Sequence, residues 1–386
     1  MTDRPDNPDR RRALGLAAIT GAAAAGAGTV AALVASSGSK SGRVRGAPAV
    51  AGQAQRTLKL VTTWPRNFPG LGTGAQRFAD RLTAVTDGRL KVTLYAAGEL
   101  VPAFECFDAV AQGKADMYHA AEYYWQGKSP AFNFFTAVPF GMIASEYNAW
   151  MRFGGGQEVW DQTARRFNIK GMPCGSTGVQ MGGWFKRPIR TLEDFQGLKI
   201  RMPGLGGEMM ARVGATPVTK SGGELYQALD QGNIDATEWV GPWNDMAFGF
   251  HRIARYYYWP GVHEPGSCLG VGINLDLWED FSPAERAAVA AAAAAENDIM
   301  LAEFNMENAR ALGRLLRDPK VEVTRFPEPV LKRLAEVGQQ VLAEQAQGDA
   351  QTAEVYDSFL KARTQVAAWG DIAERAFVQA RQLANA

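Results

Sequence analysis

The side chains best suited to bind a small charged molecule lie between residues 176 and 268. Arg201 ends a short apolar stretch at residues 198–200, which we predict to be a strand, and it precedes a glycine-rich turn. At a strand end beside a cleft, a guanidinium can form two parallel hydrogen bonds with a carboxylate. Most arginines take part in surface ion pairs, but the flanking isoleucine, methionine and proline indicate burial here. We therefore expect Arg201 to bind a carboxylate.

Side chains with oxygen atoms accompany this arginine, namely Gln180, Glu238 and Glu264. Glu238 follows residues 234–237, a predicted strand, and a lone buried carboxylate there is costly without a partner. Neutral and anionic oxygens suit a hard cation such as sodium or calcium and do not suit zinc. The sequence thus predicts a sodium or calcium ion beside the ligand, whose negative charge it would neutralise.

Aromatic residues occur in the same region and in one earlier run: Tyr123, Tyr124, Trp125, Trp184, Trp239 and Trp243. Most aromatic residues of this kind pack in a hydrophobic core, which is the simpler interpretation. At strand ends, aromatic rings can also form the wall of a ligand pocket and exclude water.

Composition argues against several other functions. The chain has three histidines and three cysteines, and the cysteines have no metal-ligand spacing, so neither a zinc site nor a disulfide framework is indicated. Few candidate catalytic bases remain, and we predict that the protein is not an enzyme. The formal net charge is +1, and the absence of a basic patch interleaved with aromatic residues argues against a nucleic-acid partner.

Two pairs of similar segments indicate an internal duplication. Residues 105–116 and 224–235 align without gaps, and each is a predicted helix closed by glycine and followed by an aspartate that opens a strand. PGLG sequences at residues 69–72 and 203–206 both lie between a predicted strand and a predicted helix. Neither has the order of a phosphate-binding or dinucleotide-binding loop. Chance similarity between amphipathic helices is the alternative, whereas a duplication predicts two similar lobes.

The alternation of strands and helices predicts an α/β protein of two lobes separated by a cleft. We assign residues 57–178 to lobe 1, with return of the chain from about residue 269, and residues 179–268 to lobe 2. A capping box at Ser282 opens an alanine-rich helix of about 30 residues, roughly 45 Å long. This helix begins a helical C-terminal region, residues 282–386, which can brace both lobes or pack against a second subunit.

Residues 1–51 have the order of an export signal: a polar start, a basic run at residues 10–12 and a weakly apolar stretch rich in alanine and glycine. The basic run resembles a twin-arginine motif, and Ala49 and Ala51 offer a cleavage site. An uncleaved membrane anchor is the alternative, although alanine and glycine make a poor permanent span. We predict a periplasmic protein exported by the twin-arginine route.

Distinctive motifs occur around the predicted site: Gly183-Trp-Phe, Gly197-Leu-Lys-Ile-Arg201 and Gly232-Asn-Ile-Asp-Ala-Thr-Glu-Trp239. They resemble the solute-receptor subunits of tripartite ATP-independent periplasmic (TRAP) transporters. Longer segments resemble the branch of that family that binds 2-oxo acids: residues 63–72, 97–104, 179–184 and 237–242. The resemblance implies a two-lobed, type II-like periplasmic-binding-protein fold with an interlobe cleft, a hinge and long C-terminal helices. It also implies TRAP membrane subunits as partners and a possible homodimer that exchanges a C-terminal helix.

The resemblance also implies roles for the site residues. Arg201 matches the arginine that forms a salt bridge with the ligand carboxylate. The family holds its cation with an amide, a carboxylate and a backbone carbonyl, which correspond to Gln180, Glu238 and Trp239. Tyr124 and Glu264 match positions of further ligand contacts. Glu264 also offers oxygen to the cation.

The predicted function is a periplasmic receptor that binds a pyruvate-like 2-oxo monocarboxylate together with a cation and delivers it to a TRAP membrane complex. Ser267-Cys268 departs from the family pattern, so the identity of the acid stays open, as do the choice between sodium and calcium, signal cleavage and helix exchange. A metal-assisted lyase or aldolase that uses Glu238 and a cation is the main rival. A sensor receptor for the same ligands is a third possibility.

Overall fold

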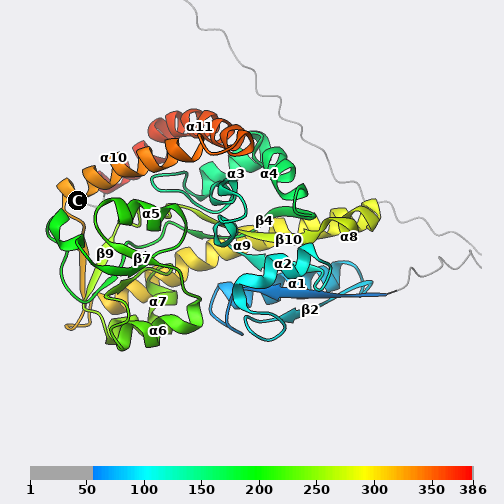
Figure 1. Ribbon diagram of the computed structural model, residues 1–386, viewed down its shortest axis with the longest axis horizontal. Helices are drawn as coiled ribbons and strands as arrows, with labels where there is room; N and C mark the ends of the chain where they lie inside the picture. Colours follow the sequence, from blue (N-terminus) through cyan, green and yellow to red (C-terminus); the bar gives the residue numbers. More distant parts are fainter. Residues whose placement is uncertain (1–54, 385–386) are drawn as a thin grey trace, which may run out of the picture. The chain divides into compact units, whose positions relative to one another are not determined.

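The computed structural model describes residues 55–384, so the predicted export signal at residues 1–51 lies outside the described residues. Within residues 55–384, no helix has both the length and the apolar character needed to cross a membrane. The described chain contains two β-sheets with helices packed around them (Figure 1). We call the two halves centred on these sheets the first and second lobe, and they agree with the predicted α/β architecture.

The first lobe contains a sheet with the strand order β2-β1-β3-β10-β4. Its strands are β1 (Arg56–Thr62), β2 (Leu90–Tyr95), β3 (Met117–Ala120), β4 (Ile169–Gly178) and β10 (Ser267–Asn274). The helices are α1 (Leu71–Val85), α2 (Cys106–Ala111), α3 (Ala144–Phe153), α4 (Gly156–Arg165) and α8 (Leu275–Asp280). β1 pairs in parallel with β2 and β3, and β10 runs antiparallel to β3 and β4. Every residue of β10 is buried, as expected for a strand covered on both faces.

The second lobe contains a sheet with the strand order β11-β9-β5-β8-β6-β7. Its strands are β5 (Gly183–Phe185), β6 (Lys199–Arg201), β7 (Thr216–Val218), β8 (Ala236–Thr237), β9 (Tyr256–Trp259) and β11 (Glu322–Arg325). The helices are α5 (Gly204–Arg212), α6 (Gly222–Asp230), α7 (Pro242–Phe248) and α10 (Glu328–Gln345). β6 pairs in parallel with both β7 and β8. The carboxyl ends of β6 and β8 therefore lie at the same edge of the sheet.

The duplicated segments have the same local structure in both lobes. Gly113 after α2 and Gly232 after α6 have φ angles of 71° and 75°, the left-handed conformation that glycine adopts most easily at a helix end. Asp116 and Asp235 directly precede β3 and β8. The predicted helix, glycine and strand units are confirmed.

The chain passes between the lobes in segments without regular structure: residues 179–182, 260–266 and 316–321. The first two segments are hydrogen-bonded to each other, because Gln180 N donates to Glu264 O at 3.2 Å and Gly261 N donates to Gln180 O at 3.0 Å. Paired crossing segments of this kind form a hinge at which a few residues can absorb a change in backbone angles.

The long helix α9 (Pro283–Leu315, 33 residues) begins at the predicted capping box of Ser282 and Glu285. It packs against β4 and α1 of the first lobe and against α7 of the second. Figure 1 shows it in yellow, extending from one lobe to the other. The C-terminal elements α11 (Ala350–Gly370), η6 (Asp371–Arg375) and α12 (Ala376–Ala384) follow, and α11 packs on α3 and α4.

The loop before α1 contacts the second lobe directly. Phe68 stacks on Phe248 of α7 with ring centroids 4.3 Å apart, and Asn244 Nδ2 donates to Pro69 O at 3.0 Å. The two lobes are thus in contact along the rim of the region where the predicted site residues lie.

A fully buried carboxyl group, Glu122, lies in the core of the first lobe. The hydroxyl of Tyr118 is 3.0 Å from Oε1 and 2.9 Å from Oε2 of Glu122. A Cβ atom at Gly270 would lie 2.4 Å from Oε1, so glycine at this position makes room for the carboxyl group. Burial raises the pKa of Glu122 from 4.5 to about 8, although the hydrogen bond from Tyr118 lowers it.

We expect Glu122→Gln to stabilise the protein in alkaline buffer. Because the folded state binds this proton more tightly, wild-type stability falls as the pH rises from 4.5 to about 8. Glutamine cannot ionise, so the variant does not lose this stability. One pKa unit corresponds to about 1.4 kcal/mol, and the free energy of unfolding of the variant should therefore exceed that of wild type by a few kcal/mol near pH ~9. The difference should vanish near pH ~4. Urea unfolding across this pH range measures it. Glu158→Gln is the control, because Glu158 is exposed. A gain in stability of Glu122→Gln that does not change with pH would contradict the prediction.

Candidate functional site

Two parallel strands of the second lobe bring the central pair of the site together. Arg201 of β6 is in register with Thr237 of β8, so Glu238 lies one residue beyond the neighbour of Arg201. Glu238 N donates to Arg201 O at 3.2 Å. Ligands of α/β proteins commonly bind beyond the carboxyl ends of parallel strands, which is where these side chains lie.

Arg201 and Glu238 form an ion pair whose side chains are 1% and 0% exposed. Nη1 of Arg201 donates to Oε1 of Glu238 and, at 3.3 Å, to its backbone oxygen. Nε donates to Lys220 O at 3.3 Å, and Nη2 donates to the Tyr124 hydroxyl at 3.5 Å. The guanidinium carbon lies 4.9 Å from the centroid of the Trp239 ring. Burial, the largest single influence, lowers the pKa of Arg201, but the charge of Glu238 and those of the neighbouring Tyr124, Tyr123 and Glu264 together raise it more, so the net pKa is raised.

His263 and Glu264 complete a cluster of buried titratable groups. Nε2 of His263 lies 3.2 Å from Oε2 of Glu238, and one ligand atom each from Glu238, His263 and Glu264 lie within 4.8 Å of one another. Burial lowers the pKa of His263, but its hydrogen bond with Glu238 and the nearby negative charges raise it more. Burial raises the pKa of Glu264, and the negative charge of Glu238 raises it further.

Gln180 connects this cluster to the hinge. Its Nε2 donates to Oε2 of Glu264 at 2.8 Å, to Ser267 Oγ at 3.1 Å and to Thr177 Oγ1 at 3.2 Å. Oε1 of Gln180 and Oε1 of Glu264 are buried and have no hydrogen-bond partner among residues 55–384. Buried polar atoms normally have partners, so these oxygens fit a hard, oxygen-preferring cation.

Aromatic rings from both lobes form one wall of the site. The Trp64 ring lies 6.3 Å from the rings of both Tyr124 and Trp239. Its Nε1 donates to Nδ1 of His119 at 2.8 Å, and Nε2 of His119 lies 3.2 Å from Cys174 O. Burial lowers the pKa of His119 to about 4, so the ring is neutral, accepts at Nδ1 and donates at Nε2. This chain of hydrogen bonds fixes the orientation of Trp64.

The predicted site residues come together around a small cavity between the lobes. It has a volume of about 10 Å³ and is lined by Trp64, Leu71, Tyr123, Tyr124, Thr177, Gln180, Arg201, Trp239, Val240, Glu264 and Leu269. Glu238 contacts Arg201 beside it. A single water molecule needs about 10–15 Å³, so the surrounding groups are closely packed and shielded from solvent.

Some of these residues were not assigned to the site from the sequence, above all Trp64 and His263. The signal for Trp64 was its position two residues beyond the end of β1, close to a strand end of the first lobe. Conversely, Trp184 stacks on Tyr257 with ring centroids 4.1 Å apart inside the second lobe, in line with the simpler interpretation that most of these aromatic residues belong to the core.

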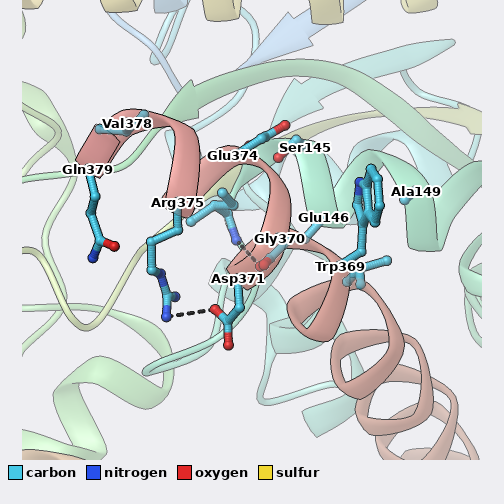
Figure 2. Close-up of a pocket in the computed structure, with 12 residues that line it drawn as sticks. Ser145, Glu146, Ala149, Trp369, Gly370, Asp371, Glu374, Arg375, Val378 and Gln379 are labelled. Carbon is cyan, nitrogen blue, oxygen red and sulfur yellow. Dashed lines mark hydrogen bonds and ion pairs between the residues drawn. The ribbon is translucent and has the colours of Figure 1, made fainter. Parts of the chain in front are cut away.

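A larger groove of about 490 Å³ lies between α3 and the C-terminal helices (Figure 2). Figure 2 shows Trp369 over Ala149 and the ion pair of Asp371 with Arg375, at 2.6 Å. The groove contains none of the predicted site residues. The size of a surface groove is therefore no guide to the position of the charged site in this chain.

Residues 60–349 match the model of the family described as bacterial extracellular solute-binding protein, family 7. The chain belongs to this family. Membership confirms the two-lobed receptor fold and the receptor function expected from the sequence. The family consists of extracellular solute-binding proteins, so this chain is one of them and is not an enzyme.

Relatives of this solute-binding protein are similar over most of their length. A monocarboxylate 2-oxoacid-binding periplasmic protein of Nostoc sp. is 39% identical over 319 residues, covering 83% of this chain and 87% of the relative. A TRAP periplasmic solute binding protein from Pseudoalteromonas atlantica, solved with sodium and pyruvate, is 38% identical with a TM-score of 0.82, over 84% of this chain and 99% of that one. A Bordetella bronchiseptica TRAP transporter solute binding protein, a dimer with calcium and picolinate, is 32% identical with a TM-score of 0.84, over 86% and 98%.

We expect Arg201→Met to lower the free energy of unfolding of the solute-binding protein by about 3 kcal/mol. This value is the lower end of the range typical of a broken buried ion pair, because His263 still faces Glu238 in the variant. The double variant Arg201→Met/Glu238→Gln should recover most of this loss, because no uncompensated charge remains. Urea unfolding without ligand tests both.

The exposed pair of Arg165 and Glu279, 3.1 Å apart, provides a control. Arg165→Met should change the unfolding free energy by no more than about 1 kcal/mol. A double variant as unstable as Arg201→Met would show that lost packing, and not the unpaired charge of Glu238, causes the effect.

Proposed function

We propose that this solute-binding protein captures a 2-oxo monocarboxylate of about the size of pyruvate, together with a sodium or calcium ion, between its lobes. The observation that carries the proposal is a fully buried arginine beside carboxylate and amide oxygens, two of which have no partner in the described chain. The relatives named with 2-oxoacids, or solved with pyruvate and sodium, support the choice of ligand.

Arg201 would bind the ligand carboxylate through its planar fork of N–H groups. The hydroxyl of Tyr124 lies at the Nη2 side of that fork and can contact the same ligand. Trp64 and Trp239 would cover it with apolar surface. Exclusion of water strengthens the ion pair, because Coulomb interactions grow as the effective dielectric falls.

Gln180 and Glu264 would hold the cation through their unpartnered oxygens, and Glu238 and the backbone carbonyl of Trp239 would complete the oxygen shell. When bound, the cation supplies positive charge that balances the carboxylates around it. Gln180 and Glu264 also form the paired hinge segments. Occupation of the site is therefore expected to favour the closed arrangement of the lobes.

The two lobes that would close on the ligand are residues 57–178 with the return from about residue 269, and residues 179–268. The later elements β11 and α10 pack with the second of these and would move with it. The loaded protein would then deliver its ligand to TRAP membrane subunits. A sensor receptor would share the same site, and the identity of the membrane partner distinguishes the two. Export by the twin-arginine route, through the basic run at residues 10–12, stays a prediction about residues outside the described part.

Arg201→Ala should weaken pyruvate binding roughly 100-fold or more, because truncating one side of a desolvated charged contact costs several kcal/mol. Arg201→Lys should fall between this variant and wild type, since lysine keeps the charge and loses the fork. Isothermal titration with pyruvate in sodium buffer measures both, and circular dichroism checks that the variants are folded. Arg165→Ala, at an exposed position, is the control, and unchanged affinity in Arg201→Ala would refute the assignment.

We also propose that the C-terminal region, residues 282–386, mediates a homodimer. Its last helical segments expose large apolar side chains: Trp369, Ile372, Phe377 and Leu383 are 68%, 74%, 64% and 81% exposed. Large apolar side chains that are exposed in the same segment are typical of a protein interaction site. The dimer described for the Bordetella bronchiseptica relative supports the proposal.

The double variant Ile372→Glu/Phe377→Glu should convert the dimer to a monomer, because the new charges would be buried at the interface. Sedimentation velocity measures the change. Phe153→Glu serves as the control, since Phe153 is 92% exposed on α3 and is not part of the terminal helices. A wild-type protein that is monomeric at high concentration would contradict the proposal.

A further inference from the structure

Glu238 accepts hydrogen bonds from N–H groups of Arg201 that a ligand carboxylate would need. Nη1 gives its hydrogen bonds to the side chain and backbone of Glu238, and Nε gives one to Lys220 O. A carboxylate bound by two parallel hydrogen bonds requires two N–H groups on one side of the fork. Nη1 cannot supply them while it is bound to Glu238. The Glu238 carboxylate and a ligand carboxylate therefore compete for the same guanidinium.

This competition does not depend on how the lobes are arranged. Arg201 and Glu238 both belong to the second lobe, at the adjacent ends of β6 and β8. Tyr124, which also contacts the guanidinium, belongs to the first lobe. Separation of the lobes would remove Tyr124 from Arg201 and leave Glu238 in place. The competing carboxylate is thus present in an open as well as a closed protein.

Glu238 has a second set of neighbours to which it can turn. Its carboxylate lies close to that of Glu264, and the unpartnered oxygens of Glu264 and Gln180 are in the same cluster. A move of Glu238 towards these oxygens brings negative and partly negative atoms together in a buried region, which is unfavourable by itself. The move becomes favourable only when positive charge is present among these oxygens.

We propose that Glu238 is an internal competitor that holds Arg201 until the cation binds, and that this change of partner couples the cation to the carboxylate ligand. The inference rests on the proposed function. A monocarboxylate alone would add a second negative charge at Arg201, and a cation alone would draw Glu238 away and leave Arg201 without a counter-charge. When the cation and the monocarboxylate bind together, Glu238 pairs with the cation and Arg201 pairs with the ligand carboxylate. Because such coupling is reciprocal, each ligand raises the affinity for the other by the same factor.

Glu238→Gln separates this role from that of a simple cation ligand. The variant has no competing carboxylate, so in choline chloride, without sodium or calcium, it should bind pyruvate more tightly than wild type by roughly tenfold, within the range of about 5- to 150-fold typical of such couplings. Sodium chloride should strengthen pyruvate binding by wild type and have little effect on the variant. Isothermal titration in the two salts measures these affinities. If Glu238 served only to hold the cation, the variant would bind no better than wild type in choline, and that result would overturn the inference.

Asp245→Asn is the matched control, because it changes another buried carboxyl group of the second lobe, bonded to Trp184 and Tyr257, and keeps the pair of Arg201 and Glu238. It should gain no pyruvate affinity in choline, and an equal gain would mean that any lost negative charge suffices, which would also overturn the inference. Should Glu238→Gln fail to fold, Glu238→Ala removes the same competitor and permits the same comparison. If wild-type protein does not bind pyruvate even in saturating sodium, the proposed function itself is refuted. If wild type binds pyruvate but Glu238→Gln does not bind it more tightly in choline chloride, only the coupling through Glu238 is refuted.

Discussion

The burial of Arg201 and Glu238 as a pair is the constraint on which the rest of the site depends. Each charge costs several kcal/mol to remove from water, and attraction offsets that cost only when the two groups are adjacent and well hydrogen-bonded. The parallel pairing of β6 and β8 provides this adjacency, because it sets the residue after Thr237 beside Arg201. The pairing of these two short strands therefore holds the ion pair in a position shielded from solvent.

The second feature is that the oxygen cluster lies on the hinge. Gln180 and Glu264 belong to the segments that connect the lobes, and their backbones are hydrogen-bonded to each other. A change at their side chains and a change in the lobe arrangement thus involve the same residues. The first lobe contributes mainly apolar groups, with Trp64 oriented through a neutral His119. The second lobe provides the charged pair, and the aromatic rings that exclude water come from both lobes, so the site is complete only when the lobes meet.

Much of the local structure could be predicted because it depends on neighbouring residues alone. The capping box at Ser282, the left-handed Gly113 and Gly232, and the aspartates that precede β3 and β8 all follow from short-range rules. The candidate site residues were recognised from strand-end positions and from motifs shared with a family. Trp64 and His263 were missed as site residues. A position just beyond a strand was the one signal for Trp64, and it does not by itself distinguish a pocket aromatic from one in the core. The contact of His263 with Glu238 joins residues 25 positions apart.

The sequence by itself thus determined the α/β class, the duplicated unit and the types of side chain available for a carboxylate and a cation. Only the tertiary structure decided which of these side chains are partners. Arg201 pairs with Glu238 across 37 positions, and Gln180 bonds to Glu264 across 84. Such pairs depend on strand order and register, which are set by the packing of the whole lobe. The same reason explains Glu122, whose pKa is raised because distant segments close around it and exclude water.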